Sequence, residues 1–260
     1  MNDSILTTRD GDIVTVTLNR PDKLNALNRA MWEGLGETVR LLSANDSLRC
    51  IVLRGAGGKA FAAGADIAEF ATERANARQA KQYGDLIHAT MQAVAQCRHP
   101  TVALIEGACV GGGLEIAAMC DMRICGSSSR FGVPINKLGL TMGYGELAGL
   151  LSLVGRAVAL EILLEGRVFT ADEAYHKGLV NRVVADDQVE PEAYALARRI
   201  ADGAPLVARW HKQFIRRLTP QPAALSEAEI NANFDYFNTE DYRIGYDAFI
   251  NRQKPRFTGR

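Results

Sequence analysis

Three consecutive glycines followed by a glutamate form the part of this sequence best suited to chemistry. Residues 101–121 read TVALIEGACVGGGLEIAAMCD, so Gly111, Gly112 and Gly113 precede helix-forming residues and Glu115 follows closely. A helix that begins at these glycines offers unpaired N–H groups and the positive end of its dipole to a phosphate or a developing oxyanion. Helical side chains lean toward the N-terminus, which would bring the Glu115 carboxylate back over the glycines. The pattern predicts proton transfer beside a polarised carbonyl.

Phosphate binding is one alternative role for the glycines. A nucleotide-binding P-loop ends in Gly-Lys-Ser/Thr, and residues 55–60 (GAGGKA) lack the hydroxyl residue. A dinucleotide-binding fingerprint needs the spacing G-x-G-x-x-G, which the residues from Gly107 to Gly113 do not give. The other alternative is structural: the glycines allow a helix to pack closely on a strand, and Glu115 is solvated.

Strands and helices alternate around this stretch. Apolar and β-branched runs predict strands at residues 12–19, 50–53, 101–105, 122–125 and 181–184, with an extended piece at 131–134. Amphipathic patterns predict helices at 29–45 after an Asn28 cap, at 74–96, 144–154 and 156–164, and after Thr170. Residues 59–69 form a second stretch of small residues between a strand and a helix, with Gly64 at its centre. The chain is therefore an α/β protein in which strand, strand, helix recurs.

The last quarter of the chain is entirely helical in pattern. Helices are predicted at 192–203, 205–218, 225–238 and 241–251. The segment carries many aromatic residues: Phe234, Tyr236, Phe237, Tyr242, Tyr246 and Phe249. These rings either pack on another subunit or cover the core of their own protomer. We therefore divide the chain into an α/β core at residues 1–190 and a C-terminal helical oligomerisation region at 191–260.

Composition excludes several classes of function. Thirty basic residues balance thirty acidic ones, so the chain has no electrostatic footprint for nucleic acid or an anionic membrane. No uninterrupted apolar run has membrane-spanning length, and the start MNDSILTTRDGD is not a signal peptide. The cysteines lack metal-site spacing and are predicted to be reduced core residues, at positions Cys50, Cys97, Cys109, Cys120 and Cys125. A cytoplasmic protein without a metal site is expected.

Together these stretches resemble the crotonase family, the enoyl-CoA hydratase/isomerase superfamily, nearly end to end. The resemblance is carried by residues 19–27, by AFAAGADI at 60–67, and by residues 106–121, 170–184 and 245–260. It implies a right-handed spiral of ββα units with a C-terminal helical layer that builds a trimer, often doubled to a hexamer. It also implies an acyl- or enoyl-CoA thioester as substrate, with no metal or redox cofactor.

The resemblance assigns catalytic roles to three residues and leaves a fourth role vacant. The N–H groups of Ala65 and Gly112 would hold the thioester oxygen, and Glu115 would transfer the proton. The second glutamate of the family's hydratases would fall at Ile135, which cannot exchange a proton. Hydration by two glutamates is therefore in doubt for this sequence.

Further residues are expected to contact substrate. By the same resemblance they are Lys23, Leu24, Ala63, Asp66, Ile67, Tyr144 and Phe249. Lys23 could meet a phosphate of coenzyme A or be an exposed turn lysine, whereas Phe249 matches a tail position that reaches a neighbouring subunit's CoA site.

The remaining polar residues are open to more than one interpretation. Tyr144 and Glu146 could reach the site; otherwise Tyr144 is a packing residue and Glu146 is solvated. Asp121 is expected to tie down a helix end. The histidines are interpreted as structural because no serine or cysteine partner motif accompanies them, at His88, His99, His176 and His211.

Three functions remain open. The first is hydration or one-base isomerisation of an enoyl-CoA through enolate stabilisation. The second is decarboxylation or hydrolysis of a CoA thioester on the same fold, and the third is a non-catalytic CoA-binding protein. The paired oxyanion positions beside a retained glutamate argue against the third.

Overall fold

Two sheets form the centre of the chain in the computed structural model, which describes residues 3–219 and 224–260. The larger sheet has the order β1 (Ile5–Asp10), β2 (Ile13–Leu18), β3 (Cys50–Gly55), β5 (Thr101–Ile105), β7 (Met122–Gly126) and β10 (Arg182–Val184). The smaller sheet has the order β4 (Ala60–Ala62), β6 (Ala108–Val110), β8 (Arg130–Gly132) and β9 (Phe169–Thr170). Neighbouring strands are parallel except in the β1–β2 and β8–β9 pairs.

A repeated ββα unit connects the two sheets. Each of the pairs β3–β4, β5–β6 and β7–β8 gives its first strand to the larger sheet and its second to the smaller. Helices follow each pair: α2 (Phe70–Glu73) with α3 (Ala77–Ala95), then α4 (Gly112–Met119), then α5 (Tyr144–Glu165). This is the predicted crotonase-like spiral of ββα units, and the α/β fold class is confirmed.

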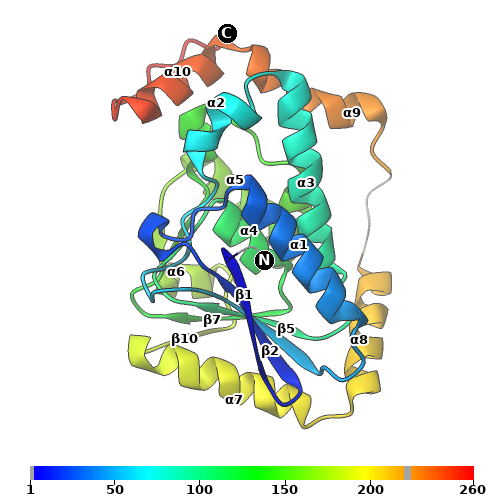
Figure 1. Ribbon diagram of the computed structural model, residues 1–260. Helices are drawn as coiled ribbons and strands as arrows, with labels where there is room; N and C mark the ends of the chain where they lie inside the picture. Colours follow the sequence, from blue (N-terminus) through cyan, green and yellow to red (C-terminus); the bar gives the residue numbers. More distant parts are fainter. Residues whose placement is uncertain (1–2, 220–223) are drawn as a thin grey trace.

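Helices cover both faces of the larger sheet (Figure 1). Because side chains alternate across a strand, Ile51 and Leu53 of β3 join the core beneath α1 (Arg29–Ala44) and α3. Cys50 and Val52 of the same strand face the opposite way and pack with α7 (Val189–Ala201). Burial on both faces explains why the central strands read as continuous apolar runs.

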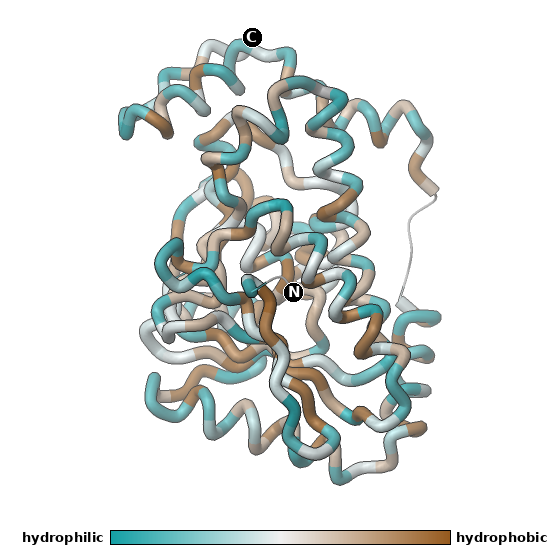
Figure 2. Tube along the Cα trace, viewed as in Figure 1, coloured by the Kyte–Doolittle hydropathy of each residue, from teal (hydrophilic) through white to brown (hydrophobic). Residues whose placement is uncertain are grey.

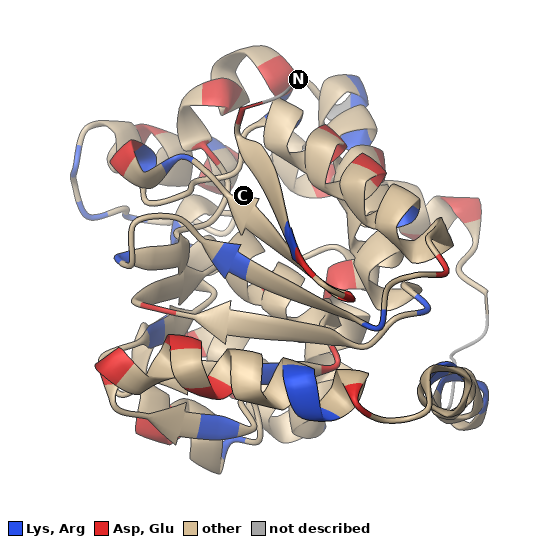
Figure 3. Cartoon of the chain, turned by 60° about the horizontal axis from the view of Figure 1, so that its bottom comes forward, with Lys and Arg blue, Asp and Glu red and all other residues tan. Residues whose placement is uncertain are grey.

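The helix α7 spans the proposed boundary between the α/β core and the C-terminal helical region. The proposed boundary between residues 190 and 191 falls inside α7, whose buried face packs on the larger sheet. Its first turn carries Glu190 and Glu192 and its last turn Arg198 and Arg199, which complements the helix dipole. Figure 3 shows the acidic positions of α7 toward one end of the helix and the basic positions toward the other.

The C-terminal helices separate into two groups (Figure 1). α8 (Pro205–Leu218) lies beside the end of α7, whereas α9 (Glu227–Ala232) and α10 (Glu240–Ile250) lie over α2 and α3. Rings of the second group pack on one another, with the Phe237 and Tyr242 centroids 4.5 Å apart. The Phe234 ring packs against Gly84 of α3. Several of these rings therefore pack within their own protomer, and packing on another subunit stays a prediction.

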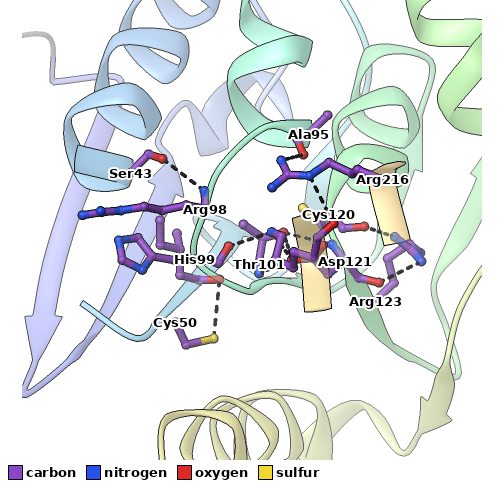
Figure 4. Close-up of polar contacts among 12 residues, drawn as sticks. Ser43, Cys50, Ala95, Arg98, His99, Thr101, Cys120, Asp121, Arg123 and Arg216 are labelled. Atoms are coloured by element: carbon purple, nitrogen blue, oxygen red, sulfur yellow. Dashed lines mark hydrogen bonds and ion pairs between the residues drawn. The ribbon is translucent and has the colours of Figure 1, made fainter. Parts of the chain in front are cut away.

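Polar contacts around Asp121 fix the end of α4 (Figure 4). Thr101 donates to Asp121 Oδ2 from its backbone N–H at 2.7 Å and from its hydroxyl at 3.0 Å. Lys212 Nζ of α8 reaches the same oxygen at 2.5 Å, and Arg123 donates to the Cys120 carbonyl at 2.5 Å. Asp121 therefore links β5, the end of α4 and α8, in agreement with the structural role expected for it.

Several predicted elements differ from the observed ones. β1 was not predicted, because almost all of its side chains are exposed and its sequence carries no apolar alternation. The helix predicted at 225–238 is α9 followed by a 3₁₀ turn at Asp235–Asn238. The helices predicted at 144–154 and 156–164 are the two halves of α5, which is kinked at Gly155, where φ is 71°.

Apolar residues concentrate on the central strands, as Figure 2 shows, but one helix is also strongly apolar. Among the described residues, α5 is the one helix long and apolar enough to cross a membrane, judged by length and composition. The sequence analysis does not single it out because Arg156 and Glu161 interrupt its apolar run. α5 packs against α4 and exposes leucines to the surface, at Leu151, Leu160 and Leu164.

The cysteines are core residues, as predicted. All five are buried and free of disulfides: Cys50, Cys97, Cys109, Cys120 and Cys125. Burial raises the pKa of the Cys50, Cys120 and Cys125 thiols to about 12, so these thiols stay protonated and unreactive.

Candidate active site

Two loops meet at the carboxyl ends of β4 and β6. These strands pair in parallel with Ala60 opposite Ala108, so the residues that follow them lie side by side. A Cβ atom on Gly111 would lie 3.6 Å from the Gly64 Cα. Both glycines have positive φ, 108° at Gly64 and 51° at Gly111, a conformation that side chains disfavour. The two glycine-containing stretches of the sequence therefore form one site.

Each loop presents a backbone N–H without a partner. Leu27 N donates to the Gly64 carbonyl and Asp66 N donates to the Leu27 carbonyl, both at 2.8 Å, so the Ala65 N–H lies between them unused. Gly112 is the first residue of α4, and the N–H groups of a first turn have no acceptor within their helix. Within residues 3–219 and 224–260, no atom accepts from the N–H of Ala65 or Gly112.

Both residues line a cavity of about 710 Å³. Its wall comes from the two loops, from α2, α3 and the start of α5, and from the 3₁₀ turn at Pro134–Leu138. Most of the residues predicted for the site line it: Ala63, Ala65, Asp66, Ile67, Gly112, Glu115, Tyr144 and Phe249. A volume of this size suits a drug-sized organic ligand.

Lys23 and Leu24 do not line this cavity. They belong to the turn after Pro21, and the Leu24 carbonyl accepts a hydrogen bond from Ala63 N at 3.0 Å. The Leu24 side chain is 43% exposed. Both residues therefore lie one backbone contact away from the cavity wall, at its outer side.

Glu115 reaches the cavity from the first turn of α4. Burial raises the pKa of its carboxyl to about 8, and the charge of Glu146 adds to the rise, whereas Arg74 opposes it. The carboxyl is therefore exchangeable close to neutral pH, as a group that accepts and returns a proton must be. The alternative in which Glu115 is solvated is wrong, because its side chain faces a largely apolar cavity.

Glu146 enters the same cavity from the first turn of α5. Its side chain is 7% exposed and turns back toward Gly143, the residue that caps the helix. Burial raises the pKa of this carboxyl above its ordinary value, while its own backbone N–H and His88 act in the opposite direction. The interpretation of Glu146 as a solvated residue is therefore wrong. Tyr144, two residues earlier, is 44% exposed at the cavity rim.

Ile135 lines the cavity where the resemblance placed a second glutamate. It lies in the turn at Pro134–Leu138 and packs against the main core. No carboxyl therefore enters the site from this turn.

His88 and Arg74 line the cavity although the sequence did not place them at the site. His88 was interpreted as structural, but it lines the cavity, packs against Gly145 and lies 2.7 Å from the Gln92 amide nitrogen through its Nε2. Its position one and two turns after Gly84 and Ala80 places all three on one face of α3, a signal that the spacing contains. Arg74, between α2 and α3, also lines the cavity, and nothing in its local sequence marks it.

The C-terminal segment closes the cavity of its own chain. Its contributions are Leu225, Ile230, Asn233, Phe234, Tyr236 and Phe249. Phe249 lines the cavity of its own chain because α10 packs on the turn at Pro134–Leu138. Its contact with a neighbouring subunit's CoA site stays a prediction.

Comparison with known proteins decides the family. The sequence matches the model of the family described as enoyl-CoA hydratase/isomerase over residues 8–260. The chain belongs to the enoyl-CoA hydratase/isomerase family. Its similarity to a short-chain-enoyl-CoA hydratase of Clostridium acetobutylicum is 33% identity over 252 residues, covering 96% of each chain.

Solved structures of similar proteins share the fold. An enoyl-CoA hydratase/carnithine racemase from Magnetospirillum magneticum is 53% identical and has a TM-score of 0.83, covering 99% of this chain and 96% of its own. A methylmalonyl-CoA decarboxylase in complex with 2S-carboxypropyl-CoA is 26% identical, with a TM-score of 0.89 over 99% of this chain and 98% of its own. The family fold thus accommodates more than one reaction of a CoA thioester.

Proposed function

We propose that this protein is an enzyme that hydrates or isomerises an enoyl-CoA thioester by stabilising an enolate. The observation that carries the proposal is the meeting of two loops with unused N–H groups, Ala65 and Gly112, beside the exchangeable carboxyl of Glu115. Membership of the enoyl-CoA hydratase/isomerase family supports the substrate class. A non-catalytic CoA-binding protein would not need the proton-transfer group.

The N–H groups of Ala65 and Gly112 bind the thioester oxygen in this proposal. Charge develops on that oxygen when a nucleophile adds at the β-carbon or a proton leaves the α-carbon. Donors that are already oriented stabilise this charge without reorganisation, and one such donor contributes roughly 10²–10³ in rate. Backbone donors require small residues at both positions, and the crowding of Gly112 against Trp32 and Leu27 agrees with this requirement.

Glu115 transfers the proton, and Glu146 is the candidate for the second carboxyl that hydration needs. Support for Glu146 over Tyr144 comes from its burial and from its electrostatic effect on Glu115. With Ile135 at the position of the family's second glutamate, proton shuttling between two carbons by Glu115 alone remains the simpler reaction. It needs one base, whereas hydration needs a proton removed from water and one delivered to carbon.

The remaining contacts follow from the shape of the site. Ala63, Asp66, Ile67, Tyr144 and Phe249 would contact the thioester within the cavity. Lys23 and Leu24, outside it, would contact the coenzyme A moiety, with Lys23 as a partner for a phosphate. Coenzyme A is part of the substrate, and the proposed chemistry requires no resident metal or redox cofactor.

A homotrimer, or a hexamer of two trimers, is proposed on the basis of α8 and the C-terminal region from residue 191. α8 exposes apolar side chains that a monomer would leave in water: Leu206, Val207, Trp210, Phe214, Ile215 and Leu218. The buried, reduced cysteines support the proposed cytoplasmic location.

A second reaction has specific support. Two observations favour decarboxylation as the alternative: Ile135 stands in place of the second glutamate, and the fold is similar to that of a methylmalonyl-CoA decarboxylase. Loss of carbon dioxide needs the oxyanion donors more than it needs paired acids. Purified protein should be incubated with crotonyl-CoA, 3-butenoyl-CoA and methylmalonyl-CoA, and the products identified by mass spectrometry. Turnover of either enoyl-CoA supports the proposal. Turnover of methylmalonyl-CoA alone would replace it with the decarboxylase, and failure of all three to bind would refute both.

A further inference from the structure

Arg74 is a cation in the cavity wall that forms no ion pair with any residue the structure describes. Its guanidinium carbon lies 4.2 Å from the centroid of the Phe70 ring and 4.3 Å from that of Tyr83. Its Nε is shielded from solvent and has no hydrogen-bond partner. In the part of the chain that the structure describes, the guanidinium forms no hydrogen bond or ion pair, so the two rings are its direct contacts.

Glu69 and Glu73, the acidic residues that precede Arg74 in the chain, do not form ion pairs with it. Glu69 Oε2 accepts a hydrogen bond from Arg29 N at 2.8 Å, and Glu73 forms an ion pair with the Arg29 guanidinium at 2.9 Å. Tyr83 OH contacts the same Glu69 oxygen at 3.4 Å. Both local carboxylates are thus bound by Arg29, and none of these three residues lines the cavity.

The acidic residues of the cavity wall do not form ion pairs with Arg74 either. Asp66 forms an ion pair with Arg20 at 2.9 Å, and Asp85 forms one with Lys81 at 3.0 Å. Glu115 and Glu146 make no direct contact with Arg74, although its charge acts on both carboxyls. Among the described residues, the cavity wall therefore carries a positive group without an acidic partner, together with the carboxyls of Glu115 and Glu146.

An unmatched guanidinium in an apolar wall has a physical cost. Stacking on aromatic rings offsets part of this cost, but a ring supplies no hydrogen-bond acceptor for the shielded Nε of Arg74. An anionic group on the ligand would supply the missing partner, and guanidinium binds a carboxylate through two parallel hydrogen bonds.

The position of Arg74 selects which part of the ligand carries that anion. A CoA thioester has phosphates at one end, and its acyl group lies beyond the thioester carbon. Arg74 lines the same cavity as Ala65, Gly112, Glu115 and Glu146, and its charge acts on both glutamates. Lys23, the expected phosphate contact, lies outside the cavity, and Lys137 is exposed on its rim.

We propose that Arg74 determines specificity for a CoA thioester whose acyl group carries a second carboxylate. The inference rests on the proposed function and narrows its substrate class to the monothioesters of dicarboxylic acids. Arg74 binds the distal carboxylate and thereby holds the acyl chain, while Ala65, Gly112 and Glu115 act on the thioester end.

The test is calorimetric titration with matched saturated thioesters at neutral pH. Glutaryl-CoA is compared with pentanoyl-CoA, and adipyl-CoA with hexanoyl-CoA, so that each pair differs by a terminal carboxylate, and free coenzyme A is titrated in parallel. The wild-type protein is expected to bind the better dicarboxylic member roughly ten- to a hundredfold more tightly than its neutral partner. Equal or tighter binding of both neutral thioesters would overturn the inference.

Three variants assign the preference to the residue. Arg74→Met keeps the apolar stem and should abolish the preference while pentanoyl-CoA and free coenzyme A bind within about twofold of wild type. Arg74→Lys should retain part of the preference. Arg78→Met removes an exposed arginine of the first turn of α3, four residues further along the chain, and should change nothing.

The remaining outcomes are distinguishable. If Arg74→Met weakens free coenzyme A as much as glutaryl-CoA, the arginine binds a phosphate of the coenzyme and the inference is wrong. If it weakens glutaryl-CoA and pentanoyl-CoA equally, Arg74 acts only through Glu115, which also contradicts the inference. Failure of the wild-type protein to bind any thioester or free coenzyme A would refute the proposed function instead.

Discussion

Glu115 and Glu146 enter one cavity from the first turns of two different helices, α4 and α5, and the charge of Glu146 raises the pKa of Glu115. The two glutamates come from consecutive ββα units, so the spiral itself brings them together. Glu146 thus supplies a carboxyl to the cavity that Ile135, at the position of the family's second glutamate, does not supply.

The pH dependence of turnover should reveal this relationship. Glu115 must be ionised to accept a proton, so kcat/KM for an enoyl-CoA should rise with pH and level off with a midpoint near 8. Glu146→Gln removes the neighbouring negative charge, which should shift the midpoint to lower pH. An unchanged midpoint in this variant would mean that burial alone sets the pKa of Glu115.

The free energy of unfolding should fall as the pH rises from about 4.5 to about 8. The pKa of Glu115 is raised from 4.5 to about 8 in the folded protein, so between these values the folded state holds a proton that the unfolded state has lost. The free energy of unfolding should then decrease with pH, by about 1.4 kcal/mol per unit from this group. Urea denaturation at several pH values should show a flatter dependence in Glu115→Gln. An equal slope in both proteins would contradict the assigned pKa.

Gly112→Pro tests the oxyanion donor, with Gly112→Ala as its matched control. A Cβ atom at this position would lie 3.0 Å from the Trp32 ring and 3.2 Å from Leu27 Cδ1, so both variants crowd the same neighbours. Proline alone removes the N–H, at a helix start where proline is tolerated. kcat should therefore fall roughly 10²–10³-fold further in the proline variant. Thermal melting of both variants separates this loss from unfolding, and equal kcat values would place the donor elsewhere.

Ile135→Glu should raise hydration of crotonyl-CoA. The new carboxyl would enter the cavity from the turn at Pro134–Leu138 and supply a second proton-transfer group. Parallel assays of both proteins with crotonyl-CoA and 3-butenoyl-CoA should show a gain in hydration and little gain in isomerisation. Rapid hydration by the wild-type protein would mean that another group, Glu146 first, already performs this step.

A charge on the exposed face of α8 should separate the subunits. Trp210 and Phe214 follow one another by one turn on this face and are both about half exposed in the single chain. The double change Trp210→Lys and Phe214→Lys should convert a trimer or hexamer to a monomer in light scattering. A wild-type protein that is already monomeric at micromolar concentration would remove the proposed oligomer.

The sequence predicted those parts of the fold where local pattern and burial agree. β5 is buried along its whole length, and α1 begins after Asn28, whose side chain accepts from Met31 N as a cap should. The edge strand β1 escaped because exposed strands need no apolar alternation. The kink of α5 coincided with Gly155 and was predicted, whereas the beginning of α3 at Ala77 depends on the Asn76 cap within a uniformly helical pattern.

The residues of the candidate site also differ in whether local sequence predicts them. Ala65, Gly112 and Glu115 lie in two glycine-containing stretches, which are recognisable in the sequence because each lies between a predicted strand and a predicted helix. The burial of Glu146 was not predictable, because it depends on how α5 packs on α4 and on the turn of the side chain toward Gly143. Arg74 became visible only when the partners of every nearby acid were known.

Conversion of 3-butenoyl-CoA in D₂O by wild-type protein and by Glu115→Gln tests the central claim most directly. Glu115 is proposed to remove the α-proton while Ala65 and Gly112 hold the enolate oxygen. Because Glu115 alone carries the proton from the α-carbon to the γ-carbon, wild-type protein should form crotonyl-CoA that retains mainly the substrate's own hydrogen in single-turnover measurements by mass spectrometry. The variant should be slower by about 10²–10⁴-fold while binding acetoacetyl-CoA with similar affinity. An unchanged rate in Glu115→Gln would contradict the account.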